Sequence, residues 1–144
     1  MPASENAPPW RRLAALFYDL LVLVAIWMFA AALVLLAFHG DVDVAHQPIL
    51  YHLVLQAVLL ALTALYFVVS WSRGGQTIGM RAWRVRLVDE NQRSPAPARA
   101  LLRFALGLVS WLGIFGFVWC FFDPERRAWH DLIAHTRMVV VQKA

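Results

Sequence analysis

Cysteine is almost absent from this sequence, because Cys120 is the only one in 144 residues. A lone cysteine excludes a disulfide within the chain and a metal site built from several thiolates. Cys120 lies in an apolar run, where we expect an inert, packed thiol. No Ser–His–Asp or Cys–His set occurs at a readable spacing. We therefore predict no enzymatic activity, no cofactor and no metal site, and a membrane-embedded enzyme is the least favoured class.

Charged residues are also scarce. They make up 15% of the chain, against about 25% in soluble domains. Hydrophobic residues make up 61%, well above the usual share of about 45–50%. A domain this small has too little interior to hide so much apolar surface from water. A lipid environment removes that difficulty, and the composition therefore predicts a membrane protein.

Two long apolar runs, about 13–38 and 49–71, have the length of transmembrane helices. A span needs roughly 20 residues, because each contributes about 1.5 Å to a hydrocarbon core about 30 Å thick. The first run is too long for a signal peptide and is expected to be retained. A third apolar segment covers 101–122. We predict a cytoplasmic tail at 1–9, a single membrane domain at 10–141 and a short tail at 142–144.

The segment between the second and third runs differs in character. Three glycines, Gly74, Gly75 and Gly79, indicate a turn, and residues 84–89 then alternate partly between polar and apolar. Residues 138–141 form a second short stretch with β propensity. The predicted fold is an all-α integral membrane protein with a small cytoplasmic two-stranded β element built from these two stretches.

The positions of the arginines predict the orientation. The polar connection 39–48 contains no Lys or Arg, whereas the connection after the second run is rich in arginine. Loops rich in Lys and Arg stay in the cytoplasm, so both the N-terminus and the second connection are expected there. These arginines flank apolar runs and form no continuous patch, which argues against a nucleic-acid partner. We expect a multi-pass protein of the bacterial inner membrane.

The third apolar segment has two alternative topologies. If 101–122 spans the membrane, the basic tail lies outside, against the positive-inside rule. If the segment re-enters as a broken hairpin, the C-terminus stays in the cytoplasm and the 138–141 stretch can pair with 84–89. Glycines at Gly107, Gly113 and Gly116 would permit such a break. The residues alone leave both alternatives open.

Asp19 is the most informative charged residue, because it lies within the first predicted span. A carboxylate at membrane depth costs roughly 2.5 kcal/mol or more on insertion scales and normally faces a partner. Arg12 precedes it by nearly two helical turns, so the two side chains are expected on one face of the helix. Asp19 is either an ion or proton site or a structural charge that reaches the cytoplasmic interface or pairs with an arginine of the next loop.

Asp131 is a second candidate, in a short amphipathic stretch near the predicted cytoplasmic interface. A structural salt bridge to Arg12, Arg81 or Arg127 is one interpretation. A proton relay through a neighbouring imidazole, His130 or His135, is the other, because histidine titrates near physiological pH.

Four blocks of residues, in order, together resemble the RDD family, which is named for one arginine and two aspartates. On this resemblance Arg12 is the family arginine, and Asp19 and Asp131 are the two aspartates. Met80 stands where a lysine is usual in the family, and Arg84 and His135 stand where glycine is common. The blocks that carry the resemblance are 10–19, 75–89, 99–103 and 123–134.

The resemblance implies a bacterial membrane protein for which transport has been suggested, with sodium–proton exchange described for some similar proteins. Asp19 would then bind the cation or proton, Arg12 would lower its pKa, and Asp131 would guard the cytoplasmic mouth. Two transmembrane helices are too few to enclose a transport pathway. We therefore expect a homo-oligomer or association with other membrane proteins in the lipid bilayer. The alternative is a non-catalytic scaffold or assembly partner in which the three residues form a structural charge network.

Overall fold

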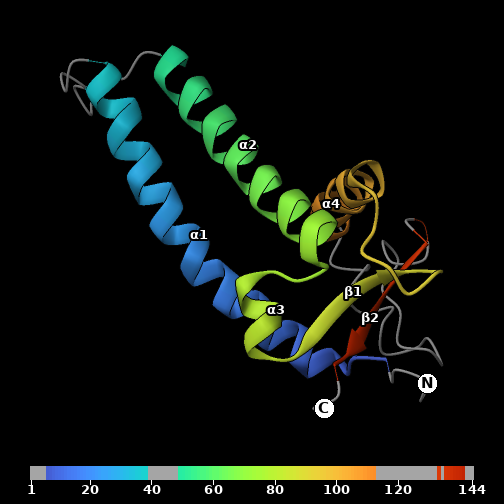
Figure 1. The fold of residues 1–144 in the computed structure, drawn as a ribbon. Coiled ribbons are helices and arrows are strands. Elements are labelled where there is room, and N and C mark those ends of the chain that lie inside the picture. Colours follow the sequence, from blue (N-terminus) through green and yellow to red (C-terminus); the bar gives the residue numbers. More distant parts are fainter. Residues whose placement is uncertain (1–5, 39–48, 113–132, 134, 142–144) are drawn as a thin grey trace.

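The computed structural model describes residues 6–38, 49–112, 133 and 135–141 of the chain. Two long helices are followed by a short helix, a strand, a third long helix and a second strand (Figure 1). In chain order the elements are α1 (Pro9–Ala37), α2 (Ile49–Gly74), α3 (Ile78–Ala82), β1 (Val85–Asp89), α4 (Pro97–Leu112) and β2 (Thr136–Val140).

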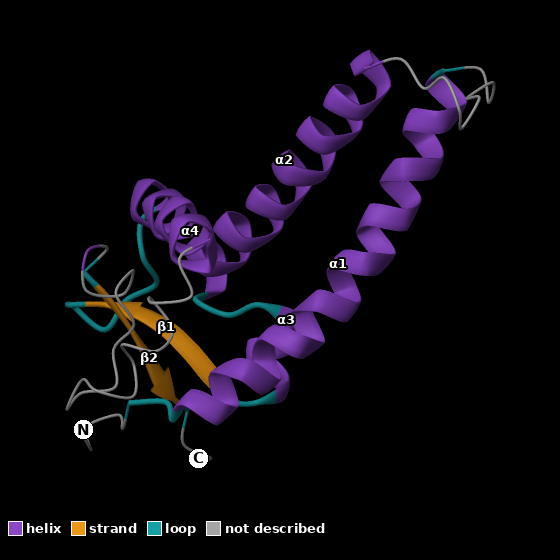
Figure 2. Ribbon diagram, turned by 180° about the vertical axis from the view of Figure 1, so that it is seen from behind, coloured by secondary structure: helices purple, strands orange, loops and turns teal. Residues whose placement is uncertain are grey.

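The helices α1 and α2 lie side by side and are both long and apolar enough to cross a membrane (Figure 2). They confirm the two predicted helical runs, although α1 begins earlier than expected, at Pro9, and α2 continues to Gly74. In their most apolar stretches only 17% and 0% of the residues are buried. The core helix of a soluble protein would be mostly buried, so both helices are compatible with a membrane protein.

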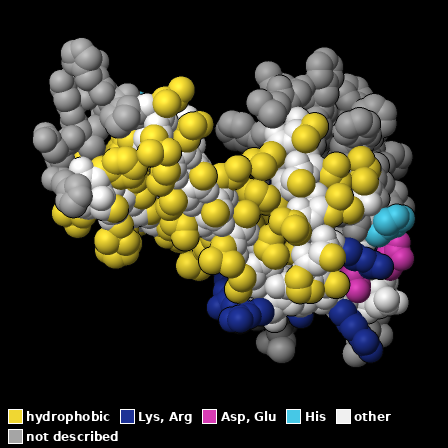
Figure 3. Space-filling model, turned by 90° about the horizontal axis from the view of Figure 1, so that it is seen from above, with side chains coloured by type: hydrophobic (Ala, Val, Ile, Leu, Met, Phe, Trp, Pro, Cys, Tyr) yellow, Lys and Arg dark blue, Asp and Glu magenta, His cyan; other side chains and the backbone are white. Residues whose placement is uncertain are grey.

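Large apolar side chains point outward along both helices. Met28, Phe29 and Leu36 are each more than two-thirds exposed, at 69%, 68% and 69%. Figure 3 shows apolar side chains over most of one face of the molecule, with Lys and Arg side chains at its edge. Midway along the pair, Trp27 Nε1 donates a hydrogen bond to Thr63 Oγ1 at 2.9 Å and ties α1 to α2.

The predicted two-stranded sheet is confirmed. Strands β1 and β2 pair antiparallel, from Val85 opposite Val140 to Asp89 opposite Thr136. The chain before α1 joins the same sheet, because the amide of Ala7 donates to the carbonyl of Met138 at 2.8 Å. Part of the segment predicted to be a free N-terminal tail is therefore fixed against β2.

Each strand is entered through a residue with a left-handed backbone. Arg84, directly before β1, has φ 53°, and His135, directly before β2, has φ 50°. These are the two positions where the sequence carries a larger residue in place of the glycine common in the family it resembles. Side chains rarely adopt this conformation, which glycine adopts freely. The backbone is therefore strained at the start of both strands.

The buried core lies at the arginine-rich end of the molecule, where five elements meet. Leu87 and Val85 of β1 are fully buried and pack in one cluster with Ala15 of α1, Trp71 of α2 and Phe104 of α4. The ring of Phe104 lies 6.1 Å from that of Phe67, which fixes the start of α4 against the end of α2. The candidate site lies beside this core, where α3 packs against α1.

Candidate functional site

Asp19 lies on α1 at the point where α3 approaches, and it is only 2% exposed. Its carboxylate accepts three hydrogen bonds from residues that follow it by 47 to 60 positions. The hydroxyl of Tyr66 donates to Oδ1 at 2.7 Å, and the hydroxyl of Thr77 donates to Oδ2 at 2.5 Å. The amide of Gly79 also donates to Oδ1, at 2.8 Å. A buried carboxylate is stable only when it is compensated in this way.

The hydroxyls of Tyr66 and Thr77 and the carboxylate of Asp19 also accept hydrogen bonds from the first turn of α3. The backbone N–H groups at the start of a helix lack partners within the helix. Here the amide of Ile78 donates to the Tyr66 hydroxyl at 3.3 Å, and that of Met80 donates to Thr77 Oγ1 at 3.1 Å. The Gly79 amide between them donates to Asp19. Both hydroxyls thus accept a hydrogen bond from an amide of α3 and donate one to Asp19, which is the final acceptor of the network.

Gly79 allows α3 to come this close to α1. A Cβ atom at this position would lie 2.1 Å from the carbonyl oxygen of Ala15 and 2.9 Å from Cγ of Asp19. Real side chains do not approach a backbone oxygen so closely, and a main-chain oxygen in the middle of a helix cannot move aside cheaply. Glycine is required here by contact with a neighbouring backbone.

Arg12 lies on the same buried face of α1 as Asp19, as the spacing predicts, and is 7% exposed. Its Nε donates a hydrogen bond to the carbonyl of Ala7 at 3.0 Å, which ties the segment before α1 to the start of the helix. Seven residues of helix separate the two along the axis by about 10 Å. Arg12 and Asp19 therefore make different contacts. Arg12 bonds to the Ala7 carbonyl, and hydroxyl and amide donors stabilise the charge of Asp19.

Arg103 is a second buried cation beside Arg12, at 2% exposure. Its guanidinium lies over the ring of Trp71 at 5.2 Å and donates to Thr136 Oγ1 at 3.2 Å, so it joins α4 to α2 and β2. Burial, and then the positive charge of Arg12, lower the pKa of Arg103 to about 9. The side chain still keeps its charge at neutral pH.

Three further residues were predicted for this site: Arg81, Asp131 and His130. Arg81 is exposed at the end of α3. Asp131 and His130 fall outside the described residues, so their predicted roles stay predictions. Within the described ranges, no three His, Cys, Asp or Glu side chains are grouped so that they could hold a metal ion.

Four residues of the site were not singled out from the sequence: Tyr66, Thr77, Gly79 and Arg103. Thr77 carried a usable signal, because a threonine directly before a short helical stretch is a typical N-cap. Gly79 was interpreted as part of a turn, although its role is close packing. Nothing in the apolar pattern around Tyr66 indicates that its hydroxyl faces a carboxylate on another helix.

Comparison with known families adds one finding. A family model described as the RDD family matches residues 6–135, which is nearly the whole chain. No curated protein and no solved structure matches the chain significantly.

Proposed function

The chain belongs to the RDD family, and from this premise we propose that it is a non-catalytic scaffold or assembly partner of the bacterial inner membrane. In this proposal α1 and α2 span the bilayer, and α3, the sheet and the start of α4 form a rigid platform at its cytoplasmic face. The partner is a second copy of the chain or another membrane protein. Asp19 holds the platform to the spans.

The hydrogen bonding of Asp19 carries this proposal. Both carboxylate oxygens are engaged by donors from α2 and the start of α3. The backbone of Gly79 fills the space in front of the carboxyl group, where even a Cβ atom would collide. An ion-exchanging carboxylate needs access to water or to an ion pathway, and Asp19 is 2% exposed. The geometry is that of a structural anchor.

The strand pairing supports a cytoplasmic platform and a re-entrant third segment. The chain leaves the sheet after β1 and returns to it at β2. In this proposal residues 90–135 begin and end on the same side of the membrane, as a re-entrant segment at 101–122 requires. In the same proposal the segment before α1 lies on that side as well, and its bridge from Asn6 to Val139 supports this. The arginine distribution favours the cytoplasm for this side.

A topology measurement tests this arrangement. We expect a reporter fused after Ala144 to give the cytoplasmic signal, as should one inserted in the 90–94 turn, while one inserted in 39–48 should give the periplasmic signal. The three positions are compared in one strain with matched expression. A periplasmic signal after Ala144 would contradict both the re-entrant segment and the sheet.

Transport is the second candidate, and one observation favours it. Two of the three donors to Asp19 are hydroxyl groups, of Tyr66 and Thr77. A hydroxyl can accept as well as donate, so it could also bind a protonated carboxyl group. Asp19 could in principle exchange a proton without loss of the surrounding structure. Donors that can also accept a hydrogen bond are one feature that a cation–proton exchanger would need at this position.

The Asp19→Asn variant separates the two functions. We expect neither the wild type nor the variant to support cation-driven proton flux in proteoliposomes. We also expect the variant to lose stability, by about 1–3 kcal/mol, because the charge-assisted hydrogen bonds weaken. Glu90→Gln is the matched control: it removes one exposed carboxylate, whose contact with His135 is a surface pair worth little. Flux in the wild type that disappears in a folded Asp19→Asn protein would establish transport and end the scaffold proposal.

A further inference from the structure

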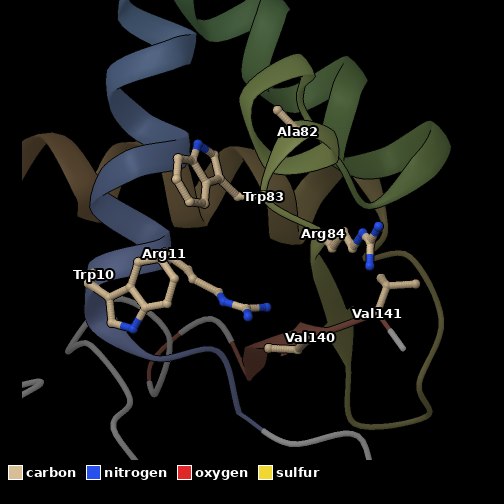
Figure 4. Close-up of a pocket in the computed structure, with 7 residues that line it drawn as sticks. All are labelled: Trp10, Arg11, Ala82, Trp83, Arg84, Val140 and Val141. Atoms are coloured by element: carbon tan, nitrogen blue, oxygen red, sulfur yellow. The ribbon is translucent and has the colours of Figure 1, made fainter. Parts of the chain in front are cut away.

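An open pocket of about 390 Å³ lies beside the start of α1. Trp10 and Arg11 of α1 form one wall, and Trp83 and Arg84, between α3 and β1, form another (Figure 4). The end of β2 closes it. The pocket shares no residue with the Asp19 network.

The pocket is basic. Two arginines line it, and none of the described residues around it is acidic. The Arg11 guanidinium lies over the ring of Trp10, 5.1 Å from the ring centre. Arg84 is held by its left-handed backbone and by a hydrogen bond of 2.8 Å from the Val141 amide to its carbonyl. Guanidinium groups suit a phosphate, whose oxygens accept paired N–H donors.

The pocket also opens at the boundary between the basic end and the apolar surface. Trp10 is 54% exposed and lies on the same stripe of α1 as Leu13 and Phe17, which are 47% and 60% exposed. Trp83 packs edge-on against Trp10 at 5.7 Å and against Tyr18 at 6.2 Å. Aromatic side chains of this kind gather where headgroups meet hydrocarbon.

We propose that this pocket binds the phosphate headgroup of an anionic phospholipid, with the acyl chains along Leu13 and Phe17. The phosphate lies between Arg11 and Arg84, and the two tryptophans flank the glycerol region. The charges select an anionic lipid over a zwitterionic one, because an amine-bearing headgroup brings a cation to a pocket that is already positive. This inference rests on the proposed placement of α1 in the bilayer.

Lipid binding to the purified protein tests the proposal. Delipidated protein in detergent is titrated with phosphatidylglycerol or phosphatidylcholine, and bound lipid is counted by native mass spectrometry. We expect phosphatidylglycerol to bind about tenfold more tightly. This preference should be lost in Arg11→Gln/Arg84→Gln and kept in Arg93→Gln/Arg99→Gln, which removes the same charge from two exposed arginines outside the pocket. The single variant Arg11→Gln should show an intermediate preference for phosphatidylglycerol. It replaces the double variant in this test if the double variant does not fold.

Three results would overturn the proposal: equal affinity for the two lipids, an unchanged preference in the pocket variants, or displacement of phosphatidylglycerol by millimolar inorganic phosphate. The last result would assign the pocket to a soluble phosphate. Retention of the protein in membranes after an alkaline wash is measured in parallel. Loss of lipid preference with intact retention then refutes the pocket alone, whereas loss of retention refutes the membrane placement.

Discussion

Replacing Gly79 with alanine is expected to destabilise the folded protein by about 2–4 kcal/mol. The added Cβ would lie 2.1 Å from the Ala15 carbonyl oxygen, so α3 must move away from α1. Overpacking alone costs about 1–3 kcal/mol. The shift also stretches the hydrogen bond from the Gly79 amide to Asp19, and a bond to a charged group contributes about 1.5–3 kcal/mol.

The measurement is thermal unfolding of the purified variants in one detergent, followed by tryptophan fluorescence and by size-exclusion profile. Gly79→Ala should lower the midpoint by on the order of 10 °C. Gly107→Ala in α4 is the matched control, because a Cβ there meets no atom of the described residues within 4 Å. Alanine is favoured over glycine inside a helix by about 1 kcal/mol, so this variant should be neutral or slightly more stable. Equal midpoints for the two variants would mean that α3 does not pack on α1 as described.

The elements of this fold could be predicted largely from the sequence. Apolar length alone defines α1 and α2, because a bilayer core requires about 20 such residues. The β1–β2 pairing was predicted because two short valine-rich stretches would otherwise leave exposed edges. The bonding of Asn6 and Ala7 to β2 could not be predicted, since no pattern marks so short an extended segment.

The site was less accessible to sequence reasoning. The burial of Asp19 and its shared face with Arg12 follow from helical periodicity. Their partners do not, because Tyr66 and Thr77 lie 47 and 58 residues beyond Asp19 and reach it only through tertiary packing. A salt bridge to an arginine was one of the alternatives that the sequence left open for this carboxylate. The structure shows that the dipoles of a helix start and two hydroxyl groups fill that role.

The buried cations show a related limit. Arg103 was counted with the loop arginines that set the orientation, yet it lies in the core over Trp71. Position relative to an apolar run indicates on which side of a membrane an arginine lies, but not whether it faces water. In this chain the arginine-rich end contains both exposed charges, such as Arg81, and structural ones, such as Arg12 and Arg103.

Thr77→Val is expected to lower the stability by about 2–4 kcal/mol, although valine has nearly the same shape. The Thr77 hydroxyl donates to Asp19 at 2.5 Å and accepts from the Met80 amide at 3.1 Å. Loss of an N-cap costs about 1 kcal/mol. Loss of the donor to the carboxylate adds about 1.5–3 kcal/mol and leaves Oδ2 of Asp19 buried without that partner. The residue is 1% exposed, so water cannot replace the hydroxyl.

Thr77→Ser is the matched control, because it removes a methyl group and keeps both hydrogen bonds. Its cost should stay near 1 kcal/mol, the value of one buried methylene. Thermal unfolding of both variants in the same detergent gives the comparison, and cellular abundance gives an independent readout. If valine and serine were equally stable, Thr77 would not hold Asp19, and the structural role proposed for the carboxylate would lose its support. A large difference between them would attribute the stability of the contact between α1 and α3 to this single hydroxyl group and its two hydrogen bonds.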